Sequence, residues 1–215
     1  MAHAQVLRGS TLGADCRVFQ GAVIGGLPQD LKFEGGDTPT SVGDGTVLRE
    51  YVTIHRGTGE AGTVVGSRAF LMAYVHVGHD GIIGDNVILA NMVQLGGFAQ
   101  IHEYAFVGGC TPVHQFCRVG AHAFVGGGYR VVQDVPPYVM ASGEPLRFGG
   151  LNVVGLRRRG FPAETRARIK QAYKFIYRSG HDLSQAVAAI KEELEPAPEI
   201  RVILGFIKQG TRGFI

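Results

Sequence analysis

The sequence contains no tryptophan, only three cysteines and no apolar stretch as long as a membrane span requires. A transmembrane helix needs about 20 predominantly apolar residues. Cys16, Cys110 and Cys117 are odd in number and lack Cys-x-x-Cys spacing, so they fit reduced thiols better than a disulfide framework. The N-terminus also lacks the basic segment and apolar run of a signal peptide. We therefore expect a cytoplasmic protein without a membrane span.

Net charge is small, which argues against nucleic acid as a partner. The 215 residues carry a formal net charge of +3, and charged residues make up 18% of the chain. A nucleic-acid-binding domain usually has a much stronger basic excess. Glycine, by contrast, is abundant at 33 residues but lacks the Gly-X-Y period of collagen. Because glycine adopts backbone conformations that other residues avoid, its abundance indicates many tight corners.

The clearest positive signal is an aliphatic residue at every sixth position, often followed by glycine. A six-residue period matches neither an amphipathic helix nor an ordinary alternating strand. It is typical of a triangular solenoid in which each hexapeptide forms one short strand and one corner, so that 18 residues complete a coil. The aliphatic positions are Leu12, Val18, Ile24, Val42, Leu48 and Ile54, and then Val65, Leu71, Val77, Ile83, Leu89, Leu95, Ile101, Val107, Val113, Val119, Val125 and Val131.

This ladder predicts a mainly β fold, a left-handed parallel β-helix followed by a small C-terminal α-helical domain. An α/β protein with glycine-rich loops is the alternative, but it does not explain a phase held from Val65 to Val131. We assign residues 1–141 to the β-helix. The phase is lost at 26–41 and 57–62, and such insertions form loops on the outside of a solenoid, where function tends to reside.

The remaining chain is expected to form a linker and a helical domain. A Pro-Pro pair before Tyr138 cannot continue strand pairing, so we expect a linker at 142–161 and the helical domain at 162–215. Asp182 and Gln185 form a variant capping box at the start of its second helix. The first and third helices are expected at 162–180 and 198–208, and the second runs through Leu194. The side of the solenoid is the simplest partner for their apolar faces.

In an 18-residue coil, residues 18 apart lie one above another, so the sequence predicts which side chains stack. His79 is expected over Gly97 and then Gln115, with His76 across a corner and Asp80 placed to orient His79. An imidazole can take a proton from a hydroxyl near neutral pH. A backbone N–H at a glycine can stabilise the negative charge that develops on an attacked carbonyl oxygen. The arrangement therefore favours acyl transfer to an alcohol.

Two other interpretations of these histidines stay open. Each of them could be a surface or corner residue without a chemical role. His76, His79 and His114 could also contribute to a zinc site shared between neighbouring chains of a trimer. His-x-x-His on a β-helix spreads its ligands around a corner, so we expect no metal.

Several strings of residues are more specific than the repeat itself. They are Pro28–Phe33, Val52–Thr58, His76–Asp80, Val113–Cys117, Gln133–Tyr138, Gly155–Phe161, Tyr173, Ile176–Gly180 and Thr211–Gly213. Together they resemble the acyl-[acyl-carrier-protein]–UDP-N-acetylglucosamine O-acyltransferases of lipid A biosynthesis, and they match that family in order along essentially the whole chain.

The resemblance implies a homotrimer with active sites between adjacent solenoids and no cofactor. It implies that a 3-hydroxyacyl group passes from acyl carrier protein to the 3-hydroxyl of UDP-N-acetylglucosamine, the first step of lipid A biosynthesis. His79 then matches the general base, Asp80 its neighbour and Gly97 the oxyanion-stabilising N–H. Residues that match substrate contacts are Gln29, Asp30, Lys32, His55, His76, His114, Gln115, Asn152, Arg158 and Arg159, and those that match acyl-chain contacts are Met72 and Gly127.

The chain departs from the family pattern at two positions on the acceptor side. Phe98 stands where the family usually has a histidine, and Val154 where it often has a glutamate. Phe98 cannot form a hydrogen bond with its side chain, although it could stack on Phe116. These changes leave open an acyltransferase for a different nucleotide amino sugar, and a non-catalytic trimeric binding protein is a further alternative. The match also begins well inside the usual solenoid, so Leu7 to Ile24 is expected to form an exposed end.

The column of Ala73, Asn91, Gly109 and Gly127 generates a prediction about acyl length. Gly127 matches the position that acts as the family's hydrocarbon ruler, and glycine leaves the groove open, so we expect a longer hydroxyacyl chain. Gly127→Met should shift the preference of the purified protein toward shorter chains, measured by competition between acyl donors. Unchanged chain-length selectivity would contradict the ruler assignment.

Overall fold

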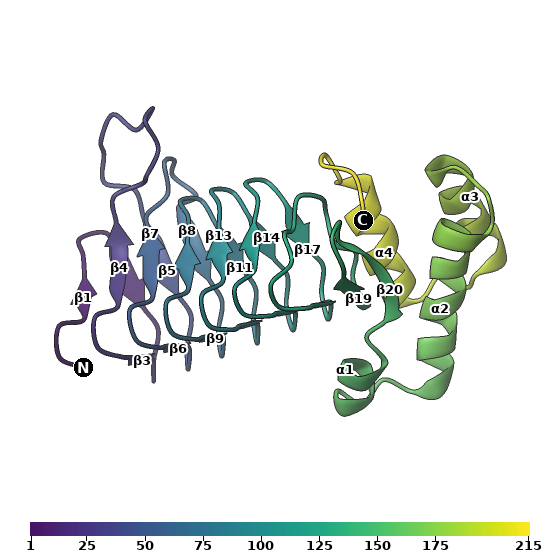
Figure 1. The fold of residues 1–215 in the computed structure, drawn as a ribbon, viewed down its shortest axis with the longest axis horizontal. Helices are drawn as coiled ribbons and strands as arrows, with labels where there is room; N and C mark the ends of the chain where they lie inside the picture. Colours follow the sequence, from purple (N-terminus) through teal and green to yellow (C-terminus); the bar gives the residue numbers. More distant parts are fainter.

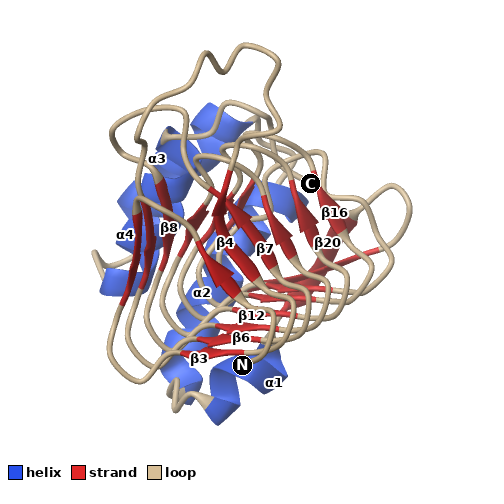
Figure 2. Ribbon diagram, turned by 90° about the vertical axis from the view of Figure 1, so that its left-hand side faces the viewer, coloured by secondary structure: helices blue, strands red, loops and turns tan.

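The structure, a computed structural model that describes residues 1–215, is a triangular solenoid whose far end carries a group of helices (Figure 1). Figure 2 looks along the solenoid and shows parallel strands on each side of the triangle, with the helices behind them. The predicted left-handed parallel β-helix with a small helical domain is confirmed. None of the helices has the length and apolar character needed to cross a membrane.

Three sheets, here called A, B and C, form the sides of the triangle. Sheet A contains β1 (Gln5–Val6), β4 (Val23–Gly26), β7 (Thr53–His55), β10 (His76–Val77), β13 (Gln94–Leu95) and β16 (Pro112–Val113). Sheet B contains β2 (Ser10–Leu12), β5 (Thr40–Val42), β8 (Thr63–Val65), β11 (Ile82–Ile83), β14 (Gln100–Ile101) and β17 (Arg118–Val119). Sheet C contains β3 (Arg17–Val18), β6 (Val47–Leu48), β9 (Phe70–Leu71), β12 (Ile88–Leu89), β15 (Phe106–Val107), β18 (Phe124–Val125), β19 (Val139–Ser142) and β20 (Arg147–Leu151).

Strand register turns the hexapeptide repeat into vertical columns. His76 pairs with Gln94 and Val77 with Leu95, so each residue lies beside the residue one coil further along. The aliphatic ladder points inward and is almost fully buried, and it forms one continuous core along the solenoid. Many corners pass through the left-handed region, as at Asp80 with φ 57° and Phe98 with φ 59°. Backbone pairing between coils thus places chemically important residues at corners next to sheet A.

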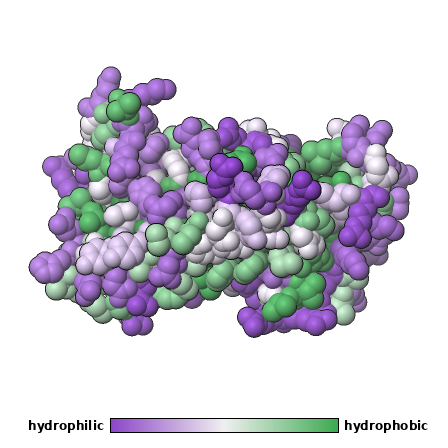
Figure 3. Space-filling model, viewed as in Figure 1, coloured by the Kyte–Doolittle hydropathy of each residue, from purple (hydrophilic) through white to green (hydrophobic).

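The two interruptions of the repeat are loops outside the solenoid, and they pack against each other. The first lies between β4 and β5 and is the projection above β4 in Figure 1; the second lies between β7 and β8. Arg56 donates from Nη1 to the Gly36 carbonyl at 3.3 Å, and Thr38 donates to the Gly57 carbonyl. Figure 3 shows an apolar patch among polar side chains at the tip of this projection, the loop that contains the exposed Leu31.

The expected linker at 142–161 proves to be structured. The chain pairs again after the prolines: β19 joins β18 in parallel, and β20 then returns antiparallel to β19. The Pro-Pro pair occupies a corner, where the backbone needs no N–H for pairing between strands. The next residue, Tyr138, resumes the hydrogen bonding between coils, because its backbone N–H donates to the Ala121 carbonyl at 2.8 Å. Helix α1 (Val153–Arg158) follows, with Asn152 as its N-cap. The segment assigned to the linker therefore contains a strand and a short helix.

The helical domain contains α2 (Ala163–Arg178), α3 (Leu183–Glu193) and α4 (Pro198–Lys208). The predicted capping box is confirmed, because the side chains of Asp182 and Gln185 each accept the other residue's backbone N–H. Buried Tyr173 of α2 donates its hydroxyl to the Pro137 carbonyl at 2.6 Å. Figure 1 shows α2 and α3 beyond the last coil, so the helices close the end of the solenoid as well as flanking it.

A buried ion pair ties the last coil to α4. Arg118 Nη2 lies 2.6 Å from Asp134 Oδ2, and the two side chains are 7% and 0% exposed. The same nitrogen donates to the Phe206 carbonyl at 2.9 Å, and the guanidinium lies 4.1 Å from the centroid of the Phe206 ring. This residue pair therefore joins solenoid and helix through charge, hydrogen bonding and aromatic contact.

Arg118→Ala should lower the free energy of unfolding by about 3–5 kcal/mol, because it leaves the Asp134 carboxylate buried without its cation. Arg130→Ala is the matched control, since Arg130 pairs with Glu144 at 3.0 Å on the surface, with side chains 69% and 56% exposed. The control should change stability by less than about 1 kcal/mol. Urea unfolding at equal protein concentration measures both values. Equal losses in the two variants would contradict this account of the buried pair.

Candidate active site

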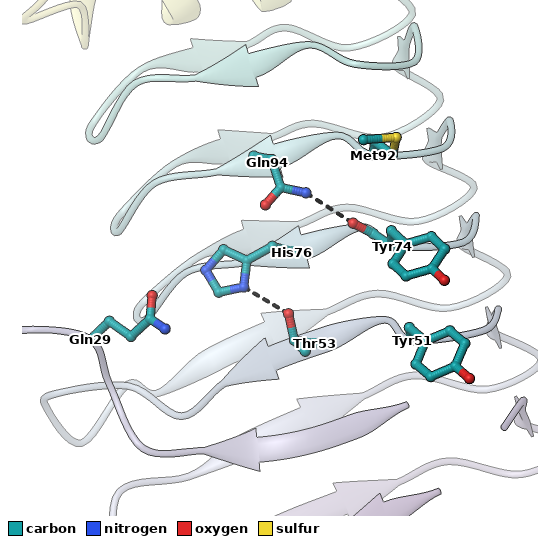
Figure 4. Close-up of a pocket in the computed structure, with 7 residues that line it drawn as sticks. All are labelled: Gln29, Tyr51, Thr53, Tyr74, His76, Met92 and Gln94. Carbon is teal, nitrogen blue, oxygen red and sulfur yellow. Dashed lines mark hydrogen bonds between the residues drawn. The ribbon is translucent and has the colours of Figure 1, made fainter. Parts of the chain in front are cut away.

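The outward face of sheet A carries a groove made of two adjoining hollows of about 560 and 410 Å³. The hollows share Gln29, His76 and Gln94. Figure 4 shows the first hollow, in which Gln29 approaches from the projecting loop while the other side chains rise from successive coils. The second hollow is lined by His55, Gly78, His79, Leu95, Gly96, Gly97, Val113, His114 and Gln115, in addition to the shared residues. We call the two hollows together the sheet A groove.

His79 and Asp80 form a hydrogen-bonded pair at the corner beside this groove. His79 Nδ1 lies 2.8 Å from Asp80 Oδ2. An ionised carboxylate can only accept, so the proton of a neutral imidazole sits on Nδ1 and Nε2 keeps a free lone pair. Nε2 is therefore the atom of His79 that can take a proton from a bound hydroxyl.

Asp80 is held in its charged form by the second external loop. The Thr58 backbone N–H donates to both carboxylate oxygens at 2.9 and 3.0 Å, and the Thr58 hydroxyl donates to Oδ2 at 2.7 Å. Burial by itself raises the pKa of Asp80, but the hydrogen bonds from His79 and Thr58 together outweigh it and bring the pKa below its ordinary value of 3.8. The carboxylate is thus available to orient the imidazole at any pH near neutrality.

Gly97 lies directly against the His79 ring, as the column argument predicted. A Cβ atom on Gly97 would lie 2.5 Å from His79 Nε2, so any side chain here would displace the imidazole. The Gly97 N–H forms no hydrogen bond within the chain. A proton acceptor and a free backbone donor therefore lie side by side, which suits a reaction that removes a proton while negative charge develops on a nearby oxygen.

Two other histidines of the groove, His55 and His76, are less basic than usual. His76 Nδ1 lies 2.8 Å from Thr53 Oγ1, and the His55 and His76 rings meet edge to face at 4.7 Å. Burial, followed by the neighbouring His55 and His79, lowers the pKa of His76 to about 4. Burial, followed by His79, also lowers the pKa of His55. These rings are neutral hydrogen-bonding groups, and no set of three or more His, Cys, Asp or Glu side chains is arranged to hold a metal ion.

Some predicted site residues lie outside the groove of their own chain. Asp30 and Lys32 are on the projecting loop, where Asp30 Oδ1 accepts the Lys32 backbone N–H at 2.9 Å. Asn152 caps α1 and also donates to the His122 carbonyl at 3.0 Å. Arg159 donates to the Tyr104 carbonyl at 2.8 Å, while the neighbouring arginine, Arg158, is exposed. The remaining two predicted residues, Met72 and Gly127, also lie outside the groove lining.

The structure adds groove residues that the sequence reasoning missed. Tyr51 and Tyr74 stack at 5.1 Å and form an exposed wall with Met92 in the first hollow. Reading residues in columns would have found this wall, because these side chains belong to successive coils. Thr58 carried no such signal, since its contact with Asp80 depends on how an external loop folds back.

Phe98 stacks on Phe116 as expected. The two rings are 4.8 Å apart and nearly parallel. Phe98 also meets the His79 ring edge to face at 5.3 Å. The corner next to His79 therefore presents an aromatic surface that offers no side-chain hydrogen bond.

Comparisons with known proteins bear on what this geometry does. A family model described as UDP N-acetylglucosamine O-acyltransferase, domain 2, matches residues 134–215, and a bacterial transferase hexapeptide model matches residues 62–97. The chain is 42% identical over 212 residues to the acyl-[acyl-carrier-protein]–UDP-N-acetylglucosamine O-acyltransferase of Verminephrobacter eiseniae, a match that covers 96% of this chain and 81% of that protein. The chain belongs to this O-acyltransferase family.

Solved structures of UDP-N-acetylglucosamine acyltransferases agree with this membership. The Bacteroides fragilis protein superposes with a TM-score of 0.96 at 42% identity, over 100% of this chain and 85% of that one. The Francisella novicida protein gives 0.95 at 38% identity, over 99% and 79%. The O-acyltransferase fold is therefore shared along essentially the whole of this chain.

The half-buried imidazole of His76 generates a prediction about pH. Its NMR titration should have a midpoint near pH 4, with the signal identified by its loss in His76→Phe. His76 takes up a proton more readily in the unfolded chain than in the folded one. As the pH falls from about 6.5 toward 4, protonation therefore favours the unfolded chain and lowers the free energy of unfolding. A midpoint near 6.5 would contradict the partial burial of this ring in the groove.

Proposed function

We propose that the chain transfers a 3-hydroxyacyl group from acyl carrier protein to the 3-hydroxyl of UDP-N-acetylglucosamine, the first step of lipid A biosynthesis. One observation carries the chemical part of this proposal: the free Nε2 of His79 lies against Gly97, whose N–H has no partner. The relatives named above carry the choice of substrates, because the V. eiseniae protein is named for acyl carrier protein and UDP-N-acetylglucosamine.

In the proposed reaction, His79 acts as general base and then as general acid. Nε2 removes the proton of the sugar hydroxyl as its oxygen bonds to the acyl carbon, and Asp80 stabilises the imidazolium that results. The Gly97 N–H donates to the carbonyl oxygen as it becomes negative. The carbon–sulfur bond to the carrier then breaks, and the imidazolium returns the proton to the departing thiolate.

The arrangement of the binding residues supports a homotrimer with sites between subunits. Arg158 and Arg159 suit a diphosphate because guanidinium groups donate two parallel hydrogen bonds, yet they do not line the groove of their own chain. We therefore assign them to the groove of an adjacent subunit, with Asn152 holding α1 in place. We also assign Met72 and Gly127 to the acyl chain, and Gln29, Asp30, Lys32, His55, His76, His114 and Gln115 to the substrates.

The free thiols support a cellular compartment for the proposed reaction. All three cysteines, Cys16, Cys110 and Cys117, are unpaired. Free thiols persist in reducing compartments such as the cytoplasm. We accordingly place the enzyme in the cytoplasm.

A second acceptor is favoured by one observation. The aromatic surface of Phe98 and Phe116 adjoins His79 and offers no hydrogen bond to a sugar. An acyltransferase of the same mechanism that acts on a different nucleotide amino sugar would fit this surface. The two acceptors are distinguished by letting UDP-N-acetylglucosamine and an amino-sugar analogue compete for a limited amount of acyl donor. The acceptor that becomes acylated in excess is the preferred one.

His79→Ala should lower kcat by about 10²–10⁴-fold, the usual contribution of a general base. Purified protein with 3-hydroxyacyl carrier protein and UDP-N-acetylglucosamine provides the assay. His181→Ala is the control, since His181 is an exposed histidine between α2 and α3. Full activity of His79→Ala would contradict its role as base. Binding of both substrates by the unaltered protein without turnover would instead indicate a non-catalytic binding protein.

A further inference from the structure

The C-terminal segment, residues 209–215, folds back onto the last coil of the solenoid. The Asp134 backbone N–H donates to the Gly213 carbonyl at 2.9 Å, and the Ile215 N–H donates to the Asp134 carbonyl at 3.2 Å. The Tyr177 hydroxyl of α2 donates to the Ile215 carbonyl at 2.8 Å. Asp134 is also the buried partner of Arg118, so the segment is anchored where the solenoid and the helices are joined.

This anchoring brings Arg212 to a histidine of the sheet A groove. The Arg212 guanidinium contacts Nδ1 of His114, at a separation of 98 residues along the chain. His114 lines the same hollow as His79 and Gly97. The proposed function gives Arg212 no role, although it lies within one of the strings that characterise the family.

Two groups compete for the same nitrogen of His114. Arg212 approaches Nδ1, and the Gln115 carbonyl oxygen lies 3.0 Å from that atom. A guanidinium has donors only, so Nδ1 must accept from Arg212 through its lone pair. A carbonyl oxygen accepts only, so a bond to Gln115 requires a proton on Nδ1. The two hydrogen bonds exclude each other.

The choice between them sets the chemistry of the other ring nitrogen. Nε2 of His114 has no hydrogen bond within the chain. When Arg212 occupies Nδ1, the proton of the neutral ring sits on Nε2, which then donates into the groove. Without Arg212, Nδ1–H donates to the Gln115 carbonyl and Nε2 becomes an acceptor. His79 is held in the opposite tautomer, because its Nδ1 faces the Asp80 carboxylate.

We propose that Arg212 is a positioning residue that fixes His114 as an Nε2–H donor to an oxygen of the acceptor substrate. The sheet A groove then contains one imidazole that accepts a proton, His79, and one that donates a hydrogen bond, His114. A substrate with several hydroxyl, carbonyl and phosphate oxygens needs both kinds of partner. This role rests on the proposed acyl transfer, but the tautomer itself does not depend on turnover.

The first test is direct observation of the tautomer by NMR of protein labelled with ¹⁵N-histidine at pH 8. His114→Gln identifies the signals of that ring by their loss. In the unaltered protein, Nδ1 of His114 should resonate as an unprotonated nitrogen and Nε2 as a protonated one. In Arg212→Gln the Nδ1–H form should become the major one. A protonated Nδ1 in the unaltered protein, or an unchanged tautomer in Arg212→Gln, would overturn the proposal.

The second test uses kinetics with a matched loss of charge. Arg212→Gln should lower kcat/KM for UDP-N-acetylglucosamine by about 5–30-fold, mainly through KM, as expected for one misdirected hydrogen bond. Arg212→Lys keeps a donor and should restore part of this loss. Arg147→Gln removes an exposed arginine of β20, and it should change neither the tautomer nor KM.

The two tests separate this inference from the proposed function. If the unaltered protein shows the Nε2–H tautomer but no acyl transfer, the proposed function fails while the assignment of Arg212 to His114 holds. If acyl transfer occurs and Arg212→Gln leaves KM unchanged, the role of Arg212 fails alone. Arg212 is exposed, so thermal unfolding of Arg212→Gln should match that of the unaltered protein.

Discussion

The backbone hydrogen bonds between successive coils are the constraint on which the rest of the structure depends. Each coil pairs in parallel with the next, so the register of the backbone fixes which residue lies beside which in the neighbouring coil. This is why Gly97 must lack a side chain: the His79 ring from the coil before occupies that space. It is also why Phe98 and Phe116 stack without any loop to guide them.

A solenoid with such regular pairing has open ends, and the C-terminal end is closed by a different set of forces. Tyr173 bonds to the backbone of the Pro-Pro corner, and the buried Arg118–Asp134 pair holds α4 against the last coil. Loss of either ion of the Arg118–Asp134 pair would leave the other buried without its partner, which is costly. The pair therefore ties α4 to the last coil. The same junction anchors the C-terminal segment, which links the helical domain to the groove through Arg212.

The groove uses neutral imidazoles more than charged groups. Burial keeps His55 and His76 from protonating easily, and the charged Asp80 is shielded by Thr58 and directed at His79. The guanidinium groups suited to phosphate lie at another corner of the triangle. This division fits the proposed homotrimer, in which each subunit would supply part of a site.

The order of residues alone determined the solenoid, the columns and the stacking of His79 on Gly97, because a six-residue period has one regular solution and its register follows by counting. The capping box at Asp182 was equally local. Counting did not place β20, α1, Thr58 or Arg212. These elements and residues lie in segments outside the hexapeptide repeat that fold back onto the solenoid. Their positions are set by packing and by hydrogen bonds between residues far apart in sequence. The tertiary structure therefore decided how the histidines are oriented, since their partners come from outside the columns.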